Sequence, residues 1–534
     1  MRFVPAVVAV VSATLGLASP ARAEWLRAET DHFIIYGDTS ERNIRAYAEK
    51  VERFDALVRT YYPIAVDHEV PKLELYMANS ADDLKRAEPN ISRSVLGFYA
   101  PNSGRIFAIA NVESTLSDDV IFHEYAHHFM FQMKSTAYPA WFVEGFAEYY
   151  ATMRIRNGRY QIGLHQPGRM NALTRPANSW VPMEDVLRWR VSPGGRYRGS
   201  EYYSVSWALT HYMLSDPART RLLGAYLSAV SQGADPIAAL DGTINRTPAE
   251  LRDDVWRYLS GSIPYLTPQI DLPSPTVTVS PMTPNEGRLA WIDLRLGRQD
   301  PNRPEPSPEQ REGETDRAFA ERREEVIQAF AEERQTLIRD ALTASAIHPD
   351  DPASVKARAR AHRLAGDPGA AIAALEPLTR PESRDSRALR YSAEAYLDQA
   401  AKSEGDERLE QIRQARSRLV QALEIDPLDF LTYLELDRMR QGMSGYPSAN
   451  DMATLEIAVA LAPQSFDARM RYARVLMSRG EPERAVAILH SVANSPHGGG
   501  LRTEGRRLIA QARAQLGLAT SEEASPEGAE LVDD

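Results

Sequence analysis

The chain has 534 residues, of which 43% are hydrophobic and 25% charged, and its formal net charge at pH 7 is −11. This length exceeds what one compact core supports and predicts roughly three domains, or two domains with linkers. The acidic balance argues against a nucleic-acid partner and against a polybasic membrane attachment. The sequence contains no cysteine, which excludes disulfides and thiolate metal sites.

The N-terminus has the parts of a secretory signal peptide. Arg2 precedes an apolar run over residues 3–17, and residues 21–23 read Ala-Arg-Ala. A basic start, a short apolar stretch and an Ala-x-Ala site are typical of a cleaved signal. We therefore expect residues 1–23 to be removed, leaving a secreted or periplasmic protein. The apolar run is too short for stable membrane insertion after signal cleavage.

Residues 24–260 are predicted to form an α+β domain. Short or alternating apolar runs predict strands, and apolar positions at helical spacing predict helices. The expected strands are 32–36, 71–77, 95–99, 105–110 and 160–164, and the expected helices are 40–62, 117–133, 141–154, 201–214 and 248–258. The segment 165–200 is rich in Pro, Gly and Arg and is expected to form loops around a cleft.

The helix expected at 117–133 carries the motif His-Glu-x-x-His at His123, Glu124 and His127. Two histidines four residues apart lie on one face of a helix, so their rings can converge on one metal ion. Glu124 stands one residue further round, close enough to hold a metal-bound water. The next expected helix carries Glu144 and Glu148 among apolar residues, where carboxylates need partners. This pattern predicts a zinc hydrolase.

These residues resemble the gluzincin group of zinc metallopeptidases, in which a second helix bearing a glutamate follows the His-Glu-x-x-His helix. The resemblance covers about residues 118–214. It implies a zincin-like catalytic domain with a Zn²⁺ cofactor. Two features depart from the family pattern. The sixteen residues between His127 and Glu144 are slightly fewer than usual, and Val143 stands where the family has asparagine.

The resemblance also implies a role for each residue of the motif. His123, His127 and Glu144 would bind the metal, and Glu124 would act as the general base. Glu148 would accept a hydrogen bond from a ligand histidine. Glu144 is favoured over Glu148 as the third ligand, and the choice between them stays open.

A tyrosine is the candidate donor to the reaction's oxyanion. In the aminopeptidase N branch a tyrosine precedes a helix of the form Tyr-x-x-Gly-x-Ala-Leu, and the segment YSVSWAL that begins at Tyr203 is similar, with Ser206 in the place of the glycine. By this resemblance Tyr203 is catalytic, with Tyr202 and His211 as substitutes. The strand that holds a substrate amino terminus in aminopeptidases is absent. Exopeptidase specificity is therefore not supported.

Proline is dense across residues 261–315, which predicts a linker with an accessory element, and Arg288–Leu296 is an expected strand within it. Residues 316–520 are predicted to form an all-α domain that begins with a charged helix over about 316–344. The acidic tail 521–534 is expected to be disordered.

Small residues recur through 316–520 at a fixed displacement. Ala359, Gly366, Ala371 and Leu375 recur as Ala473, Gly480, Ala485 and Leu489, each 114 residues later, and Ala415, Leu419, Ala422 and Pro427 follow a related order. Small residues let paired helices approach closely, and the glycine ends the first helix of a pair. This region resembles tetratricopeptide repeats. The alternative is a generic alanine-rich helical bundle.

The sequence thus predicts an α+β zincin-like catalytic domain followed by an all-α tetratricopeptide-like helical repeat domain. We expect an exported metallopeptidase that cleaves a protein or peptide substrate, with repeats that bind a protein partner or the substrate. The alternative is an envelope scaffold in which the zincin domain is inactive or structural. The intact set of two histidines and two glutamates argues against that alternative. Substrate identity, oligomeric state and the choice between endopeptidase and exopeptidase stay open.

Overall fold

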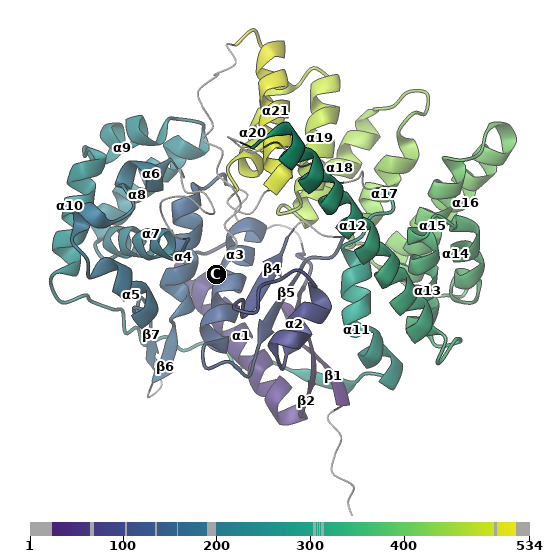
Figure 1. The fold of residues 1–534 in the computed structure, drawn as a ribbon, viewed down its shortest axis with the longest axis horizontal. Helices are drawn as coiled ribbons and strands as arrows, with labels where there is room; N and C mark the ends of the chain where they lie inside the picture. Colours follow the sequence, from purple (N-terminus) through teal and green to yellow (C-terminus); the bar gives the residue numbers. More distant parts are fainter. Residues whose placement is uncertain are drawn as a thin grey trace, which may run out of the picture.

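The computed structural model describes residues 24–64, 69–101, 104–133, 136–156, 159–188, 199–302, 306, 308, 310, 314–495 and 499–518. An N-terminal region built on a β-sheet is followed by a large helical C-terminal part (Figure 1). The expected signal peptide, residues 1–23, and the expected acidic tail, residues 521–534, lie outside the described residues. Within the described part of the chain, every helix is too short or too polar to cross a membrane.

A six-stranded sheet organises the N-terminal region, in the order β4-β5-β3-β2-β1-β8. Its strands are β1 (Glu24–Glu29), β2 (Phe33–Thr39), β3 (Leu73–Ala78), β4 (Gly97–Ala100), β5 (Phe107–Asn111) and β8 (Thr278–Pro281). Strands β2, β3 and β5 are parallel, and the remaining pairings are antiparallel. The four strands predicted between residues 32 and 110 are confirmed as β2 to β5, whereas β1 was not predicted.

Helices cover both faces of the sheet, because side chains alternate between its faces along each strand. Leu75 and Met77 of β3 belong to a core formed with α1 and α3, and Tyr76 and Ala78 belong to a second core formed with α2 and α11. These helices are α1 (Glu41–Tyr61), α2 (Ala81–Ala87), α3 (Ser117–Met133) and α11 (Pro284–Gly297). The helices predicted at 40–62 and 117–133 are confirmed as α1 and α3.

Seven more helices and a hairpin complete the N-terminal region. They are α4 (Ala140–Ala151), α5 (Pro167–Leu173), α6 (Met183–Leu187), α7 (Gly199–Leu214), α8 (Pro217–Ser231), α9 (Pro236–Ile244), α10 (Pro248–Leu259), and the hairpin of β6 (Arg154–Arg156) and β7 (Arg159–Gln161). The prediction of loops across 165–200 is wrong for its described part, which contains α5, α6 and the 3₁₀ turn Ala177–Ser179. These helices are too short to show a periodic pattern.

The strand predicted at Arg288–Leu296 is wrong, because these residues lie in α11. Leu294 of this helix packs on the sheet, while Leu289 and Leu296 pack against the helical C-terminal part. Burial on two sides hides the one-sided pattern of an amphipathic helix. The segment predicted as a linker, 261–315, therefore contributes β8 to the sheet and α11 to the contact between the two regions.

The C-terminal part is a succession of packed helices that curves over the sheet region (Figure 1). They are α12 (Asp316–Ser345), α13 (Pro352–Leu364), α14 (Pro368–Leu375), α15 (Ser386–Ala400), α16 (Gly405–Ile425), α17 (Phe430–Arg440), α18 (Ala449–Leu461), α19 (Phe466–Ser478), α20 (Pro482–Ala493) and α21 (Gly499–Gln515). From α13 to α20 they pack as consecutive pairs. Gly366 and Gly480 follow α13 and α19 with φ of 82° and 79°. This left-handed conformation costs glycine little, so their predicted role in ending helices is confirmed.

An ion network at the junction joins the sheet to the helical part. Glu74 of β3 lies 2.6 Å from Nη2 of Arg105 and 2.6 Å from Nη2 of Arg387 on α15. Asp293 of α11 pairs with Arg105 and, at 2.9 Å, with Arg360 of α13. Burial alone would raise the pKa of Glu74, but the two arginines beside it hold that pKa below its usual value. The carboxylate therefore stays ionised at the junction.

Removal of the central guanidinium tests this network. Arg105→Met keeps much of the apolar volume but leaves Glu74 with less compensation for its buried charge. We expect a loss of about 3–5 kcal/mol in the free energy of unfolding, measured by urea denaturation. The control is Arg93→Met, because the Arg93 side chain is 73% exposed and should contribute less than about 1 kcal/mol. Equal losses in the two variants would contradict a structural role for the network.

Candidate metal centre

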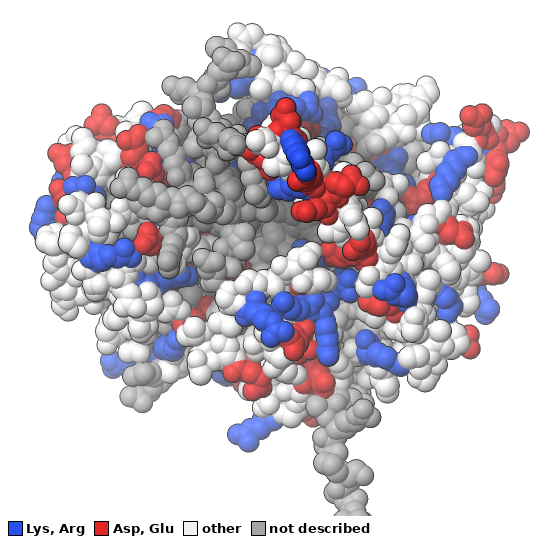
Figure 2. Space-filling view, in the orientation of Figure 1, with Lys and Arg blue, Asp and Glu red and all other residues white. Residues whose placement is uncertain are grey.

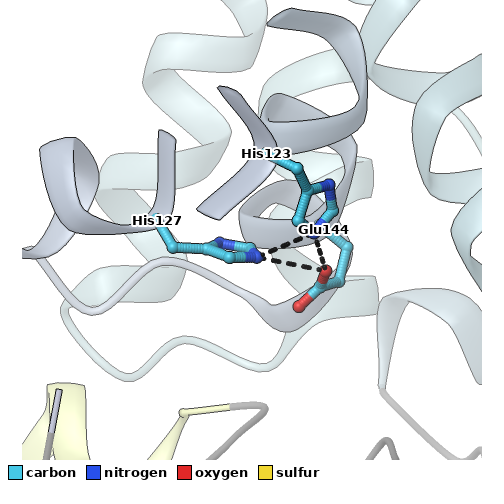
Figure 3. A group of neighbouring side chains, drawn as sticks. All are labelled: His123, His127 and Glu144. Atoms are coloured by element: carbon cyan, nitrogen blue, oxygen red, sulfur yellow. Dashed lines mark hydrogen bonds and ion pairs between the residues drawn. The ribbon is translucent and has the colours of Figure 1, made fainter. Parts of the chain in front are cut away.

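Helix α3 brings the two motif histidines together. His123 and His127 stand one helical turn apart on the same face, and their Nε2 atoms lie 3.0 Å from each other. The two rings are almost perpendicular, at 89°, and both point toward Glu144 (Figure 3). The side chain of His123 is 13% exposed and that of His127 is 4% exposed. The two ring nitrogens therefore converge on one largely enclosed point.

Helix α4 supplies a carboxylate to the same point. The Oε2 atom of Glu144 lies 3.6 Å from Nε2 of His123 and 3.6 Å from Nε2 of His127. Glu144 is fully buried, and the three candidate ligand atoms all lie within 4.8 Å of one another. Two imidazole nitrogens and one carboxylate oxygen in this arrangement could hold a transition-metal ion.

Glycine at position 145 sets the position of α4 against α7. A Cβ atom at Gly145 would clash with the carbonyl oxygen of Ser206 and with Oγ1 of Thr210. A larger residue would therefore force the two helices apart. Helix α4 is buried along its whole length, so any shift of the helix would disturb the packing around it. The Glu-Gly dipeptide thus places a candidate ligand on a tightly packed helix crossing.

Glu148, one turn after Glu144, faces the other nitrogen of the first histidine. Its Oε1 atom lies 3.6 Å from Nδ1 of His123 and accepts a hydrogen bond of 2.7 Å from Arg169. With a metal ion bound, a carboxylate beside Nδ1 would favour the tautomer with its proton there, which makes Nε2 the metal-binding nitrogen. The Arg169 guanidinium carbon also lies 4.9 Å from the centre of the Tyr203 ring. Arg169 therefore links the carboxylate to the candidate tyrosine.

The charges around His123 stabilise a cation. Burial alone lowers the pKa of His123, but its hydrogen bond with Glu144 and the charges of Glu148 and Glu124 raise the pKa to about 9. The site thus favours positive charge, whether a proton or a metal ion carries it. His128 behaves in the opposite way, since burial and the charge of Arg59 lower its pKa to about 3.

The predicted base, Glu124, lines a cavity of about 50 Å³ together with His127. This space can hold one or a few water molecules. The remaining wall residues come from both regions of the chain: Phe98, Tyr99, Pro101 and Phe131 from the N-terminal region, and Gln464, Phe466 and Ser495 from the helical part. Gln132 of α3 also donates a buried hydrogen bond of 3.1 Å to the carbonyl of Leu461. The helical part therefore forms one side of the candidate site.

Helix α7 carries the candidate oxyanion donors. Tyr203 is buried, and its ring centre lies 6.4 Å from that of His123. Tyr202 is also buried, and burial and the charge of Glu144 raise its pKa. His211 lies 2.9 Å from the carbonyl oxygen of Gly163 and 2.8 Å from the hydroxyl of Tyr258. The structure thus brings Tyr203 next to the candidate ligand His123, while His211 contacts Gly163 and Tyr258.

A second cluster of titratable residues lies between α1 and α3. His32 lies 2.5 Å from Glu52 and 3.3 Å from Asp55, and Arg59 pairs with Asp55 at 2.7 Å. Its hydrogen bond with Glu52 raises the pKa of His32 despite burial. The hydroxyl of Tyr125, on α3, donates to Asp55. Arginine and histidine balance these acids, and the cluster ties α1 to the helix that carries the motif.

Sequence reasoning missed three residues around the site. Arg169 lies on α5, in the segment predicted as loops, and nothing local marks it as a partner of Glu148. Gln464 and Phe466 come from the helical part and reach the cavity only through the tertiary arrangement. The Glu144-Gly145 pair in an apolar helix marked Glu144 as a candidate ligand, but it did not indicate the close helix crossing at Gly145.

Comparisons with known proteins leave the class of the protein open. A family model described as "Protein of unknown function (DUF1570)" matches residues 116–235, which include the converging ligands and Tyr203. No curated protein matches the sequence. Among solved structures, a thermophilic TPR protein from Thermus thermophilus is 21% identical, with 34% of this chain and 94% of that chain covered and a TM-score of 0.30.

Substitution of Gly145 tests the helix crossing. We expect Gly145→Ala to lower the free energy of unfolding by about 1–3 kcal/mol, because the added methyl group meets the backbone of Ser206. Gly224→Ala is the matched control, since nothing lies within 4 Å of a Cβ atom there and alanine favours a helix by about 1 kcal/mol. Thermal and urea unfolding measure both. Unchanged stability in Gly145→Ala would contradict the close crossing of α4 and α7.

Proposed function

We propose that this protein is a zinc-dependent metallopeptidase whose N-terminal region is a zincin-like domain of gluzincin type. The observation that carries the proposal is the convergence of His123, His127 and Glu144 from two buried helices, with Glu124 at the adjoining cavity. Two imidazoles and one carboxylate with room for water form a typical catalytic zinc set. Magnesium and calcium prefer oxygen ligands alone, which argues against them here.

In this proposal the residues of the chain divide the work of hydrolysis. When bound, Zn²⁺ would polarise the scissile carbonyl and lower the pKa of a water molecule. Glu124 takes the proton of the attacking water and passes it to the departing amine. Tyr203 donates a hydrogen bond to the oxyanion. Glu148, held by Arg169, keeps His123 in the tautomer that a metal ligand requires.

The edge of the sheet supports a peptide as the substrate. Strand β4 ends the strand order and, within the described strands, pairs with β5 alone. Phe98 and Tyr99 of this strand line the cavity that contains Glu124. An extended peptide can add to a sheet edge through backbone hydrogen bonds. A peptide bound in this way would pass beside the candidate base.

The setting of the enzyme is also part of the proposal. The residues at 1–23 support export, so we place the mature protein in the periplasm or outside the cell. We assign the consecutive helix pairs from α13 to α20 to tetratricopeptide-like repeats, supported by their pairwise packing and by the two helix-ending glycines. Repeats of this kind bind other polypeptides on their surfaces.

Replacement of the base separates metal binding from catalysis. We expect Glu124→Gln to retain one zinc ion per chain but to lose at least about 100-fold in peptide hydrolysis, because the amide cannot accept the proton of the water. Elemental analysis gives the zinc content, and mass spectrometry of a mixed peptide library gives the rate. A folded protein that takes up no zinc would refute the enzyme and favour the scaffold alternative.

The two glutamates of α4 should differ in their effect on metal affinity. Glu144→Ala removes a ligand and should abolish stable zinc binding. Glu148→Ala removes only the partner of Nδ1 and should weaken zinc affinity by about 10–100-fold. Competition with a chromophoric chelator measures both affinities. The reverse order would assign the third ligand to Glu148.

A further inference from the structure

A second, larger hollow adjoins the metal centre and has no part in the chemistry proposed above. It has a volume of about 1380 Å³ and lies between the sheet region and the helical part. On this face of the molecule, Lys and Arg side chains are interspersed with Asp and Glu side chains over the described surface (Figure 2). Pockets for small molecules usually measure about 300–1,000 Å³, so this groove is large enough for a longer ligand.

The walls of the groove come from β4 on one side and from the helix pairs on the other. Phe98, Tyr99 and Ala100 of β4 form the first wall. Most of the opposite wall comes from α13, α15, α17 and α19, each the first helix of its pair, and residues 296–302 and Leu501 of α21 also line the groove. A ligand in the groove therefore contacts several successive helix pairs. Such a surface suits an extended chain better than a compact small molecule.

The groove adjoins the small cavity beside the candidate active site. Phe98, Tyr99 and Pro101 line both the groove and the small cavity that contains Glu124 and His127. A chain that lies in the groove along β4 therefore passes beside the cavity that Glu124 and His127 line. This shared wall distinguishes the groove from an unrelated hollow in the helical part.

The side chains in the groove can contact both the apolar side chains and the polar groups of a polypeptide. Tyr391 and Leu434 offer apolar surface, whereas Arg438, Arg471 and Arg474 offer guanidinium groups. Apolar side chains of an extended ligand can pack on Tyr391 and Leu434. Its carbonyl and carboxylate oxygens can accept hydrogen bonds from the arginines. The Arg474 side chain is 48% exposed. Glu394, Glu435 and Asp467 also line the groove, and each of the three arginines is paired with a carboxylate. The groove therefore has mixed charge and matches a polypeptide with apolar side chains and hydrogen-bonding backbone groups.

We propose that this groove binds an extended segment of the substrate polypeptide and directs it along β4 to the metal centre. The delivery step rests on the proposed function, whereas binding in the groove does not. The occupant is an unfolded polypeptide segment, since the ligand must follow several successive helices beside the sheet edge.

A binding experiment on two pairs of substitutions tests this proposal. The groove variant combines Leu501→Asp with Arg474→Glu, because both residues line the groove and both are exposed. The control variant combines Leu409→Asp with Arg413→Glu on α16, whose side chains are exposed but do not line the groove. Arg474 forms an ion pair with Glu504, and Arg413 forms one with Glu410. Each variant therefore replaces one surface ion pair by two neighbouring glutamates that repel each other.

The ligand probe is fluorescently labelled, reduced and carboxymethylated α-lactalbumin, a permanently unfolded polypeptide. Binding is measured by fluorescence anisotropy to the full-length protein carrying Glu124→Gln, which leaves the probe intact. We expect the groove variant to raise Kd by at least about tenfold and the control variant to change it by less than about twofold. Equal affinities in the two variants, or no binding up to about 100 μM by the parent, would overturn the proposal.

Hydrolysis by the active chain separates this proposal from the proposed function. We expect the groove variant to lose about tenfold in kcat/KM toward the unfolded polypeptide but not toward a short peptide that fills only the metal centre. Loss of probe binding in a chain that hydrolyses nothing supports the groove and refutes the peptidase. Hydrolysis of the polypeptide that is equally fast in the groove and control variants refutes the groove alone.

Discussion

The ion network of Glu74, Arg105, Asp293, Arg360 and Arg387 fixes the helical part against the sheet. Glu74 and Arg105 are largely buried, so removal of either would leave the other with a poorly compensated charge, which makes the junction sensitive to its own geometry. Both walls of the large groove depend on this junction, since one wall belongs to the sheet edge and the other to the helix pairs. The same arrangement brings Gln464 and Phe466 to the small cavity beside Glu124.

Within the N-terminal region, the candidate metal centre depends on packing rather than on its own polar contacts. Helix α3 is held from behind by the hydrogen bond of Tyr125 to Asp55, and α4 is held by its close crossing with α7 at Gly145. The packed apolar residues around the site hold the two imidazole rings and the carboxylate close together. A pKa of about 9 for His123 is the electrostatic result of this arrangement.

The predictions from sequence succeeded where one physical signal dominated. Strands β2 to β5 are short apolar runs, α1 has its apolar residues at helical spacing, and α3 has acidic residues in its first turn. The repeated glycines at 366 and 480 end their helices as expected. The strand predicted at Arg288–Leu296 failed, because α11 is buried on two sides and its pattern is not that of a surface helix. The short helices within 165–200 failed because so few residues cannot establish a period.

The sequence by itself determined the chemistry of the candidate site. His123 and His127 lie on one helix face because of their spacing, and Glu144 follows in a helix too apolar to carry a carboxylate without partners. Only the tertiary structure decided which nitrogen of His123 each glutamate faces, that Arg169 holds Glu148, and that the helical part closes one side of the cavity. The physical reason is distance along the chain. Local spacing fixes which side chains share a helix face, but contacts between remote segments depend on how whole surfaces pack.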